Sequence, residues 1–329
     1  MVANLDIPKR GMPVTIITGF LGSGKTTLLN HILQNQQGLK VAVLVNEFGD
    51  INIDSQLLVA VEEDMVELSN GCVCCTINDN LVDAVYNVLE RNDRIDYMVL
   101  ETTGIADPLP IALTFLGTEL QFLTRLDSIL TVIDSEAFTP EHFDSEAAYN
   151  QVIYSDIIIL NKTDLVTEEK LTQLEEYIRQ EKKGARILRA VRGEVPLPLI
   201  LDVNLANPDL KEIKPKHDHH HNHDHDHHHH SHHLENDGFM AVSFTADRPF
   251  NLDRFQHFLD KQLPVDVFRA KGILWFEKLA PRYIFQLSGK RYELKTDDSK
   301  PPTGVQLVLI GRNLDGDKIK EQLRLCLVS

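Results

Sequence analysis

The sequence reads Gly19-Phe20-Leu21-Gly22-Ser23-Gly24-Lys25-Thr26 directly after the apolar run Val14–Thr18, and this stretch decides the fold. The apolar run has the composition of a buried strand, and the residues from Thr26 to Gln34 have the spacing of an amphipathic helix. A glycine-rich turn between a strand and a helix directs backbone N–H groups and the positive end of the helix dipole toward phosphate oxygens. The sequence therefore predicts a phosphate-binding loop in an α/β domain.

Several residues of this loop and of the helix start are predicted to contact a nucleoside triphosphate. They are Gly19, Gly22, Ser23, Gly24, Lys25, Thr26 and Thr27. The Lys25 ammonium can reach the β- and γ-phosphates, so Lys25 is also a candidate catalytic residue. The Thr26 hydroxyl is a candidate ligand for Mg²⁺.

Short apolar runs alternate with amphipathic stretches through the first part of the chain. The expected strands are Val14–Thr18, Val41–Asn46, Met98–Glu101, Ile129–Asp134 and Ile157–Asn161, and the expected helices are Thr26–Gln34, Asn80–Glu90 and Glu168–Glu181. Near-continuous apolar strands separated by helices are typical of a parallel sheet covered on both faces. We expect an α/β fold with a doubly wound, mostly parallel sheet that binds ligands at the carboxyl ends of its strands.

The segment Asn161-Lys162-Thr163-Asp164 ends one of these strands. At that place an Asn-Lys-x-Asp segment reads guanine, because the Asp164 carboxylate accepts hydrogen bonds from the N1–H and the exocyclic amine of the base. Adenine lacks this pair of donors, so GTP is preferred to ATP. Asn161, Lys162 and Asp164 are therefore predicted to bind the nucleotide, and Val191, in the loop Ala190–Gly193, is expected to line the base.

Two other expected strands end in candidate catalytic residues. In Glu101-Thr102-Thr103-Gly104, the Glu101 carboxylate is a candidate for Mg²⁺, held directly or through water, and the Gly104 N–H can sense a γ-phosphate. The segment Asn46-Glu47-Phe48-Gly49-Asp50 is interpreted as a switch, or else as a polar turn without a further role. Glu47 and Asp50 are its available carboxylates for the metal or the attacking water. No Gln or Arg occupies an obvious catalytic position, so we expect slow hydrolysis without a partner.

Three of the four cysteines lie within four positions, at Cys72, Cys74 and Cys75. This spacing is poor for a disulfide framework and suits thiolate ligands of Zn²⁺ or Cu(I) in a reducing compartment. Three sulfur ligands leave one position of a tetrahedral ion open, as expected of a site that loads and unloads metal. Two thiolates with a carboxylate are an alternative ligand set, and buried or redox-active cysteines are another interpretation. Cys326 lies in an apolar helical pattern and is expected in a core.

Residues 217–233 contain twelve of the chain's 15 histidines, interspersed with aspartates. Such a segment cannot bury a core, so we expect a disordered linker. Densely spaced imidazoles bind Zn²⁺, Ni²⁺ or Co²⁺ with little selectivity, which favours a metal buffer over a merely solubilising run. We therefore expect a nucleotide-binding domain over residues 1–209, the linker over 210–237 and a smaller α+β domain over 238–329.

The expected elements of the C-terminal domain lack strict alternation of strand and helix. The strands are Phe239–Thr245, Ile273–Phe276, Tyr283–Leu287 and Val305–Ile310, and the helices are Leu252–Leu263 and Asp315–Leu327. This order favours a sheet with helices on one face.

Composition excludes some functions. The formal net charge of −16 argues against a nucleic-acid partner. No apolar run approaches the roughly 20 residues that a membrane span requires, so no membrane association is expected. The first residues lack the apolar core of a secretory signal, which leads us to expect a cytoplasmic location.

These motifs together resemble the CobW-like family of P-loop GTPases, relatives of metallochaperones for nickel enzymes. The motifs occur in that family's order: Thr18–Thr27, Asn46–Gly49, Asn70–Cys75, Glu101–Gly104, Asn161–Asp164 and, in the C-terminal domain, Arg269–Trp275. The resemblance implies GTP hydrolysis coupled to metal delivery, with zinc as the commonest cargo and the cysteine motif as its site. The chain departs from some members at Val45, where they place an acid, so no metal ligand is expected there.

The expected function is that of a GTPase that binds zinc at the Cys72–Cys75 motif and passes it to a client metalloprotein, with GTP, Mg²⁺ and Zn²⁺ as ligands. Two alternatives remain at this point: a cobalt-directed accessory GTPase of cobalamin synthesis, and a histidine-rich metal storage or sensing protein. A homodimer is possible. Which carboxylate positions the attacking water is left open.

Overall fold

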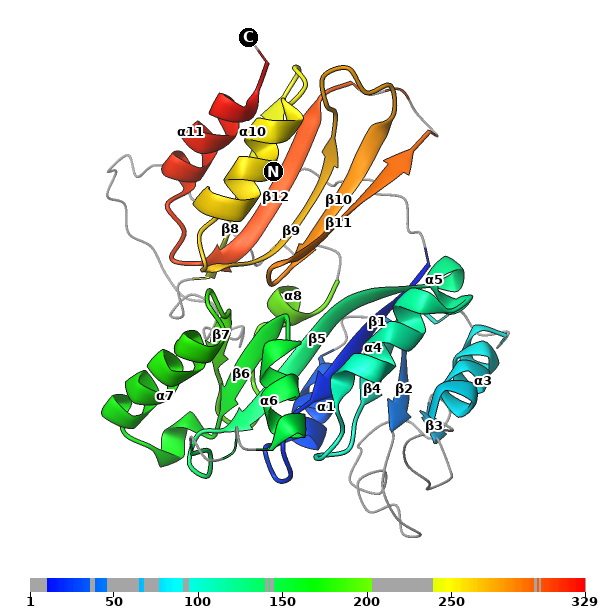
Figure 1. The fold of residues 1–329 in the computed structure, drawn as a ribbon, viewed down its shortest axis with the longest axis vertical. Coiled ribbons are helices and arrows are strands. Elements are labelled where there is room, and N and C mark those ends of the chain that lie inside the picture. Colours follow the sequence, from blue (N-terminus) through cyan, green and yellow to red (C-terminus); the bar gives the residue numbers. More distant parts are fainter. Residues whose placement is uncertain are drawn as a thin grey trace, which may run out of the picture. The chain divides into compact units, whose positions relative to one another are not determined.

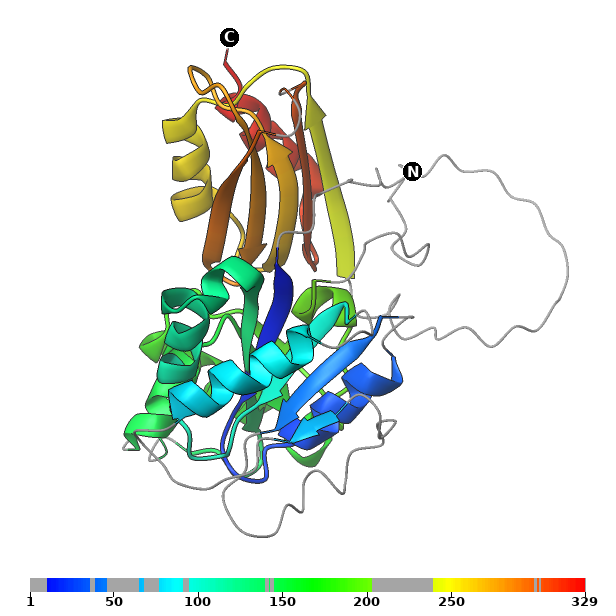
Figure 2. The same ribbon diagram turned by 90° about the vertical axis from the view of Figure 1, so that its right-hand side faces the viewer.

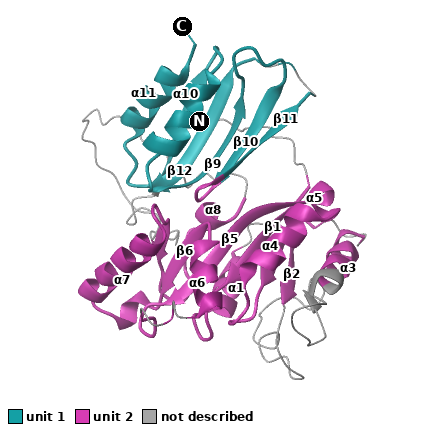
Figure 3. Cartoon of the chain, in the orientation of Figure 1, with its two compact units in different colours: residues 1–7, 204–287, 292–329 teal, residues 8–203, 288–291 magenta. Residues whose placement is uncertain are grey.

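The computed structural model describes residues 11–35, 39–45, 65–67, 77–90, 95–139, 142, 145–202, 239–298, 301 and 303–328. The chain forms two compact units (Figure 3). One comprises residues 8–203 with 288–291, and the other comprises residues 1–7, 204–287 and 292–329. The domain boundaries expected near residues 209 and 237 fall outside the described residues.

The first unit is built on a parallel sheet. Its strands are β1 (Met12–Thr18), β2 (Val41–Val45), β3 (Met65–Glu67), β4 (Tyr97–Glu101), β5 (Thr124–Asp134), β6 (Ile157–Asn161) and β7 (Ile187–Arg189). In the described part of the chain these seven strands lie in the order β3-β2-β4-β1-β5-β6-β7, and every neighbouring pair is parallel. The predicted doubly wound, parallel fold is confirmed.

Helices cover both faces of this sheet (Figures 1 and 2). They are α1 (Lys25–Gln34), α3 (Ile77–Leu89), α4 (Pro108–Gly117), α5 (Leu120–Leu123), α6 (Glu146–Ile153), α7 (Glu168–Glu181) and α8 (Leu197–Ile200), with a 3₁₀ turn, η2, at Thr163–Leu165. Figure 2 shows α1 on one side of the sheet and α4 on the other. Apolar side chains of α3 and α4 share one core cluster with β1, β2 and β4, and those of α6 and α7 share another with β6.

Local signals explain where the helices begin. Asp107 caps α4 by accepting a hydrogen bond from the backbone N–H of Leu109, with Pro108 at the first helical position. Ser145 and Thr167 cap α6 and α7 in the same way. The strands β2, β4 and β6 are buried at every position, as a parallel sheet covered on both faces requires.

Strand β5 is longer than the apolar pattern predicted, because it begins at Thr124 and not at Ile129. Polar side chains within this extension are buried in a hydrogen-bond network that the pattern does not reveal. The Tyr97 hydroxyl donates to the Asp127 carboxylate, which also accepts from the Asp202 N–H at 3.0 Å. Polar residues can therefore occupy a buried strand at this point, since each has a partner.

The second unit has an antiparallel sheet. Its strands are β8 (Phe239–Ala246), β9 (Val267–Leu274), β10 (Arg282–Ser288), β11 (Arg291–Asp297) and β12 (Val305–Arg312), in the order β11-β10-β9-β12-β8 within the described residues. The helices α10 (Leu252–His257) and α11 (Gly316–Cys326) and the π-helical turn η3 (Phe258–Gln262) complete it. Phe255 and Leu323 of the helices join one core with Phe244 and Leu307 of the sheet. Cys326 is buried in this core, and the predicted smaller α+β fold is confirmed.

Two predictions in this unit were wrong in detail. The strand expected at Ile273–Phe276 overlaps only the last two residues of β9, which runs from Val267 to Leu274 and includes Arg269 and Lys271. Charged side chains at these positions hide the strand from a hydrophobicity pattern. Strand β11, at the sheet edge, was missed because charged and polar residues dominate its sequence Arg-Tyr-Glu-Leu-Lys-Thr-Asp.

No helix in the described ranges has the length and apolar character needed to cross a membrane.

A lysine side chain closes the carboxyl end of α6. The Lys182 ammonium donates to the carbonyl oxygens of Val152 at 3.2 Å and Ile153 at 2.6 Å, and also to that of Ser155. The Val152 carbonyl also accepts from the Ser155 hydroxyl at 2.7 Å, and a cation at this end of α6 complements the helix dipole. Burial lowers the pKa of Lys182 from 10.5 to about 8.

This pKa gives the stability of the first unit a pH dependence. Between pH 8 and 10.5 the unfolded chain binds more protons at Lys182 than the folded chain, so the contribution of this residue to the free energy of unfolding rises with pH, by about 3 kcal/mol in all. Denaturant unfolding followed by circular dichroism should show wild type gaining stability relative to Lys182→Met across this window. The exposed Lys183→Met is the control, and a pH-independent difference for Lys182→Met would contradict the assignment.

Candidate nucleotide-binding site

The loop between β1 and α1 depends on two glycines. Gly19 has φ 140°, and a Cβ there would lie 2.1 Å from the carbonyl oxygen of Val132 in β5. Gly24 has φ 100°, and its Cβ would lie 2.2 Å from Nδ2 of Asn161 at the end of β6. Only glycine fits both the backbone conformation and the available space. The loop is therefore held close to the carboxyl ends of β5 and β6, where parallel sheets bind ligands.

Polar groups of the loop and its surroundings fit a phosphate. The Lys25 ammonium, at the amino end of α1, donates to the Phe20 carbonyl oxygen at 3.3 Å. The Ser23 hydroxyl is fully buried and, like that of Thr103 after β4, has no hydrogen-bond partner among the described residues. Buried hydroxyls without partners are costly, so their presence beside a glycine-rich loop supports a polar ligand at this place. Thr27 lies exposed on the first turn of α1.

Two predicted Mg²⁺ ligands contact each other. The Thr26 hydroxyl donates to Oε1 of Glu101 at 2.9 Å, and Glu101 is buried at the end of β4. The strands β1 and β4 are adjacent, with Ile17 in register with Glu101, which brings the carboxylate to the loop. A hydroxyl and a carboxylate oxygen are the hard ligands that Mg²⁺ prefers, so this pair fits that ion.

The turn after β4 packs directly on the phosphate-binding loop. A Cβ at Gly104 would lie 2.7 Å from the backbone nitrogen of Leu21. The buried Gln151 amide of α6 donates to the carbonyl oxygens of Gly104 at 3.3 Å and Ala106 at 3.0 Å. Gln151 therefore fixes the turn that carries the expected phosphate sensor. Sequence reasoning missed Gln151, because nothing near it in the chain signals a contact 47 residues away.

The Asn161 side chain bridges two loops. Its Nδ2 donates to the Ser23 carbonyl oxygen at 2.9 Å, and its Oδ1 accepts from the Gly193 N–H at 2.9 Å. Both bonds are buried, and together they join the phosphate-binding loop to the turn at residues 190–193. Asn161 therefore acts as a brace within the protein, and the second hydrogen of its Nδ2 is not used by these two bonds.

The residues that follow Asn161 lie beside the turn at residues 190–193, at the carboxyl ends of β6 and β7. The Thr163 hydroxyl donates to the Ala190 carbonyl oxygen at 3.1 Å, which holds η2 beside the turn. Asp164 is exposed, as is 39% of Val191. The structure thus brings Asp164 and Val191, which are far apart in sequence, to adjoining segments that are open to a ligand.

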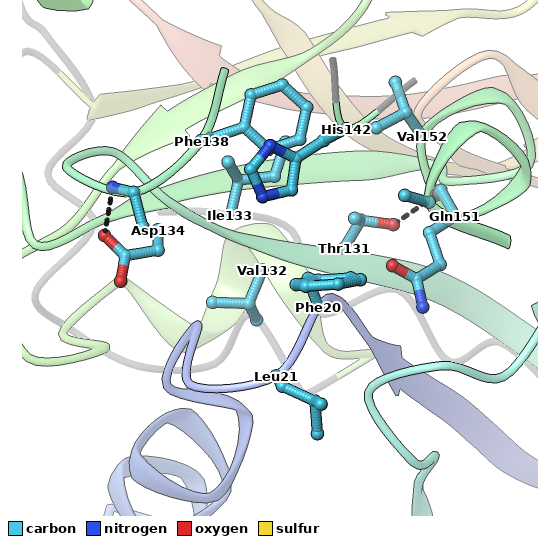
Figure 4. A pocket seen from close by; sticks show the side chains of 12 residues that line it. Phe20, Leu21, Thr131, Val132, Ile133, Asp134, Phe138, His142, Gln151 and Val152 are labelled. Atoms are coloured by element: carbon cyan, nitrogen blue, oxygen red, sulfur yellow. Dashed lines mark hydrogen bonds between the residues drawn. The ribbon is translucent and has the colours of Figure 1, made fainter. Parts of the chain in front are cut away.

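A small pocket lies beside the phosphate-binding loop (Figure 4). It is lined by Phe20, Leu21, Thr131, Val132, Ile133, Asp134, Ala137, Phe138, His142, Ala148, Gln151 and Val152. The ring of His142 stacks on that of Phe138, with 4.9 Å between the ring centroids. It meets the Phe20 ring edge-on, with 5.3 Å between centroids. The cavity volume of about 30 Å³ matches one water molecule. This volume is far smaller than a nucleobase, so the pocket is not a candidate site for the base.

Some predicted site residues lie outside the described part of the chain. They are Glu47, Asp50, Cys72, Cys74, Cys75 and the histidines of residues 217–233. Among the described residues, no three His, Cys, Asp or Glu side chains are grouped as a metal site.

Replacing Asn161 by Ala should affect both stability and nucleotide binding. It leaves the buried Gly193 N–H and Ser23 carbonyl without their partner, at a cost of about 2–3 kcal/mol in the free energy of unfolding. Thermal unfolding and GDP titration of Asn161→Ala should both show a loss. The exposed Asp164→Ala is the control, which should lose GDP affinity while its stability changes by less than about 0.5 kcal/mol. Unchanged stability of Asn161→Ala would argue against the brace.

Replacing Gly104 by Ala should impair turnover more than binding. The added methyl group would meet the backbone of Leu21 at 2.7 Å, so the turn or the loop must shift. We expect steady-state GTP hydrolysis to fall at least about 10-fold in kcat, with GDP affinity changed by less than about 3-fold. Gly117→Ala is a matched control, because a Cβ there meets nothing within 4 Å. Wild-type kcat in Gly104→Ala would exclude Gly104 from the catalytic turn.

Each of the two units matches the model of a known domain family. The model of the CobW/HypB/UreG nucleotide-binding domain matches residues 13–189, and that of the cobalamin synthesis protein cobW C-terminal domain matches residues 239–327. The phosphate-binding loop, Glu101 and Asn161 all lie within the first match.

Curated relatives cover most of the chain. The zinc-regulated GTPase metalloprotein activator 1 of Dictyostelium discoideum is 35% identical over 80% of this chain, which spans 63% of that relative's length. The zinc chaperone CobW of Pseudomonas aeruginosa is 32% identical over 96% of this chain and 92% of its own length. The zinc chaperone YjiA of Escherichia coli is 31% identical, with 93% and 96% covered. As its motifs predicted, the chain belongs to the CobW/HypB/UreG family of P-loop GTPases.

Proposed function

We propose that this protein is a GTP-hydrolysing metallochaperone that binds Zn²⁺ at Cys72, Cys74 and Cys75 and passes it to a client metalloprotein. The observation that carries the proposal is the contact between Thr26 and Glu101. It links the phosphate-binding loop to β4, whose carboxyl end leads to the expected γ-phosphate sensor, Gly104. The segment that follows β4 can therefore respond to whether a γ-phosphate is bound.

The described residues support a role in phosphoryl transfer. Lys25 and the N–H groups at the start of α1 would bind the β- and γ-phosphates, and Asp164 would select guanine. Thr26 and Glu101 would hold Mg²⁺, which neutralises the charge that develops on the phosphate oxygens. Gln151 holds the Gly104 turn in place, so that its N–H is oriented before the nucleotide binds. Glu47, Asp50 and Glu101 are the candidates for positioning the attacking water.

The location of the cysteine motif in the chain supports coupling to the nucleotide. Residues 68–76 connect the carboxyl end of β3 to the amino end of α3. Because β3 is parallel to β2, its carboxyl end lies at the same edge of the sheet as the phosphate-binding loop. We infer that nucleotide state alters thiolate geometry, and that hydrolysis loosens the metal for transfer. By reciprocity, Zn²⁺ then changes GTP affinity by the same factor.

The names of the relatives support zinc as the cargo and a metalloprotein as the client. The histidines of residues 217–233 would collect Zn²⁺, Co²⁺ or Ni²⁺ for the more selective thiolates. A cytoplasmic location accords with cysteines that are kept reduced.

Zinc affinity measured in two nucleotide states tests the proposal. Competition with a chromophoric chelator should give a Kd for Zn²⁺ that differs at least about 10-fold between the GDP complex and the complex with a non-hydrolysable GTP analogue. Equal affinities in the two states would refute the delivery mechanism.

Two variants locate the metal in the same assay. Cys74→Ser should lose the tight Zn²⁺ ion, and removal of residues 217–233 should leave one tight ion and the GTPase activity intact. If the deletion instead removed nearly all bound metal, a storage protein would be the better description. Hydrolysis rates with Zn²⁺ or Co²⁺ added to Mg²⁺ separate a zinc chaperone from a cobalt-directed one, and sedimentation in each nucleotide state tests the possible homodimer.

A further inference from the structure

Lys162 lies in the predicted guanine-binding segment, but its ammonium points to a residue outside that segment. Nζ of Lys162 forms an ion pair with Oδ2 of Asp134 at 2.6 Å. The backbone of Lys162 has φ 59°, in the left-handed region that non-glycine residues rarely adopt. Both the backbone and the end of the side chain are thus constrained at a position between Asn161 and Asp164.

Asp134 is well suited to hold this lysine. It is the last residue of β5 and lies in register with Asn161, the last residue of β6. Its other carboxylate oxygen accepts from the N–H groups of Glu136 at 2.9 Å and Ala137 at 3.1 Å. Burial alone would raise the pKa of Asp134, but the hydrogen bonds from Lys162, Ala137 and Glu136 outweigh it and lower the pKa below 3.8. The carboxylate is therefore a fixed and ionised anchor.

The constraint matters because a free lysine side chain has many conformations. Fixing it on nucleotide binding costs up to about 2 kcal/mol of side-chain entropy. Asp134 imposes this order before the ligand arrives. The ion pair engages only the ammonium, and 33% of the Lys162 side chain is exposed. The methylene chain, two residues before Asp164, is therefore available as an apolar surface for the flat face of a base.

We propose that Asp134 is a positioning residue for guanine-nucleotide binding, which holds the Lys162 side chain where its methylenes pack against the base. The inference deepens the proposed function and rests on its guanine site. Asp134 itself touches neither the base nor the phosphates, so its effect is on affinity and leaves the chemical step unchanged.

Purified full-length variants test this proposal through GDP titration and steady-state GTP hydrolysis. Asp134→Asn keeps the shape and an acceptor oxygen for the two N–H groups, but it loses the charge that holds Lys162. We expect the Kd for GDP and the KM for GTP to rise about 5- to 20-fold, with kcat within about 2-fold of wild type. Glu168→Gln is the matched control, because it removes another ion pair of the same unit, with Arg189 at 2.6 Å, and should leave both constants unchanged.

A double-variant comparison separates positioning from a merely structural role. Lys162→Met keeps the apolar chain but loses the anchored ammonium, so the double variant with Asp134→Asn should bind GDP no more weakly than the weaker single variant. Wild-type GDP affinity in Asp134→Asn, a fall in kcat without a change in KM, or losses that simply multiply would overturn the proposal. If wild type bound ADP as tightly as GDP, the guanine site would be wrong, and the inference would fall with it.

Discussion

A single buried carboxamide organises the nucleotide edge of this protein. Asn161 accepts from Gly193 and donates to Ser23, so it joins segments that are separated by 32 and 138 residues of chain. The same group explains the backbone at Gly24, since a side chain there would occupy the space of the amide nitrogen. The phosphate-binding loop, the segment after β6 and the turn after β7 are thus fixed by one another. Loops held in this way bind a ligand without first being ordered.

A second set of contacts surrounds the phosphate side of the edge. Thr26 joins the loop to the end of β4, and Gln151 joins the following turn to α6. The segment that we propose to bind guanine has a contact of its own, the ion pair of Lys162 with Asp134 at the end of β5. The phosphate-binding loop and the Gly104 turn each follow the carboxyl end of a parallel strand, and Asp134 ends another, so short side chains suffice to connect them. The architecture of the sheet, more than any single motif, makes a shared response to nucleotide possible.

Local sequence patterns predicted the phosphate-binding loop and most strands of the parallel sheet. Gly19, Gly24 and Thr26 belong to an eight-residue motif whose spacing has a physical cause, and β6 is apolar up to its last residue, Asn161. The supporting residues could not be found in this way. Lys162 pairs with Asp134, which lies 28 residues earlier in the chain, and no local sequence pattern near either residue predicts this ion pair. Polar residues also concealed the first part of β5, and charges concealed the whole of β11, since the partners of these side chains come from elsewhere in the fold.

The length of β5 affects which parts of the sequence can change during evolution. Asp127 lies in the first half of β5 and Asp134 at its carboxyl end, and at about 3.3 Å per residue this part of the strand separates them by roughly 23 Å. Asp202, which hydrogen-bonds to Asp127, is the last described residue before the histidine-rich stretch. The described part of the first unit therefore ends far from the phosphate-binding loop, and longer connections add only slowly to the cost of closing a loop. The number of histidines in residues 217–233, and with it the proposed metal capacity, can therefore change without lengthening the loops at the nucleotide edge.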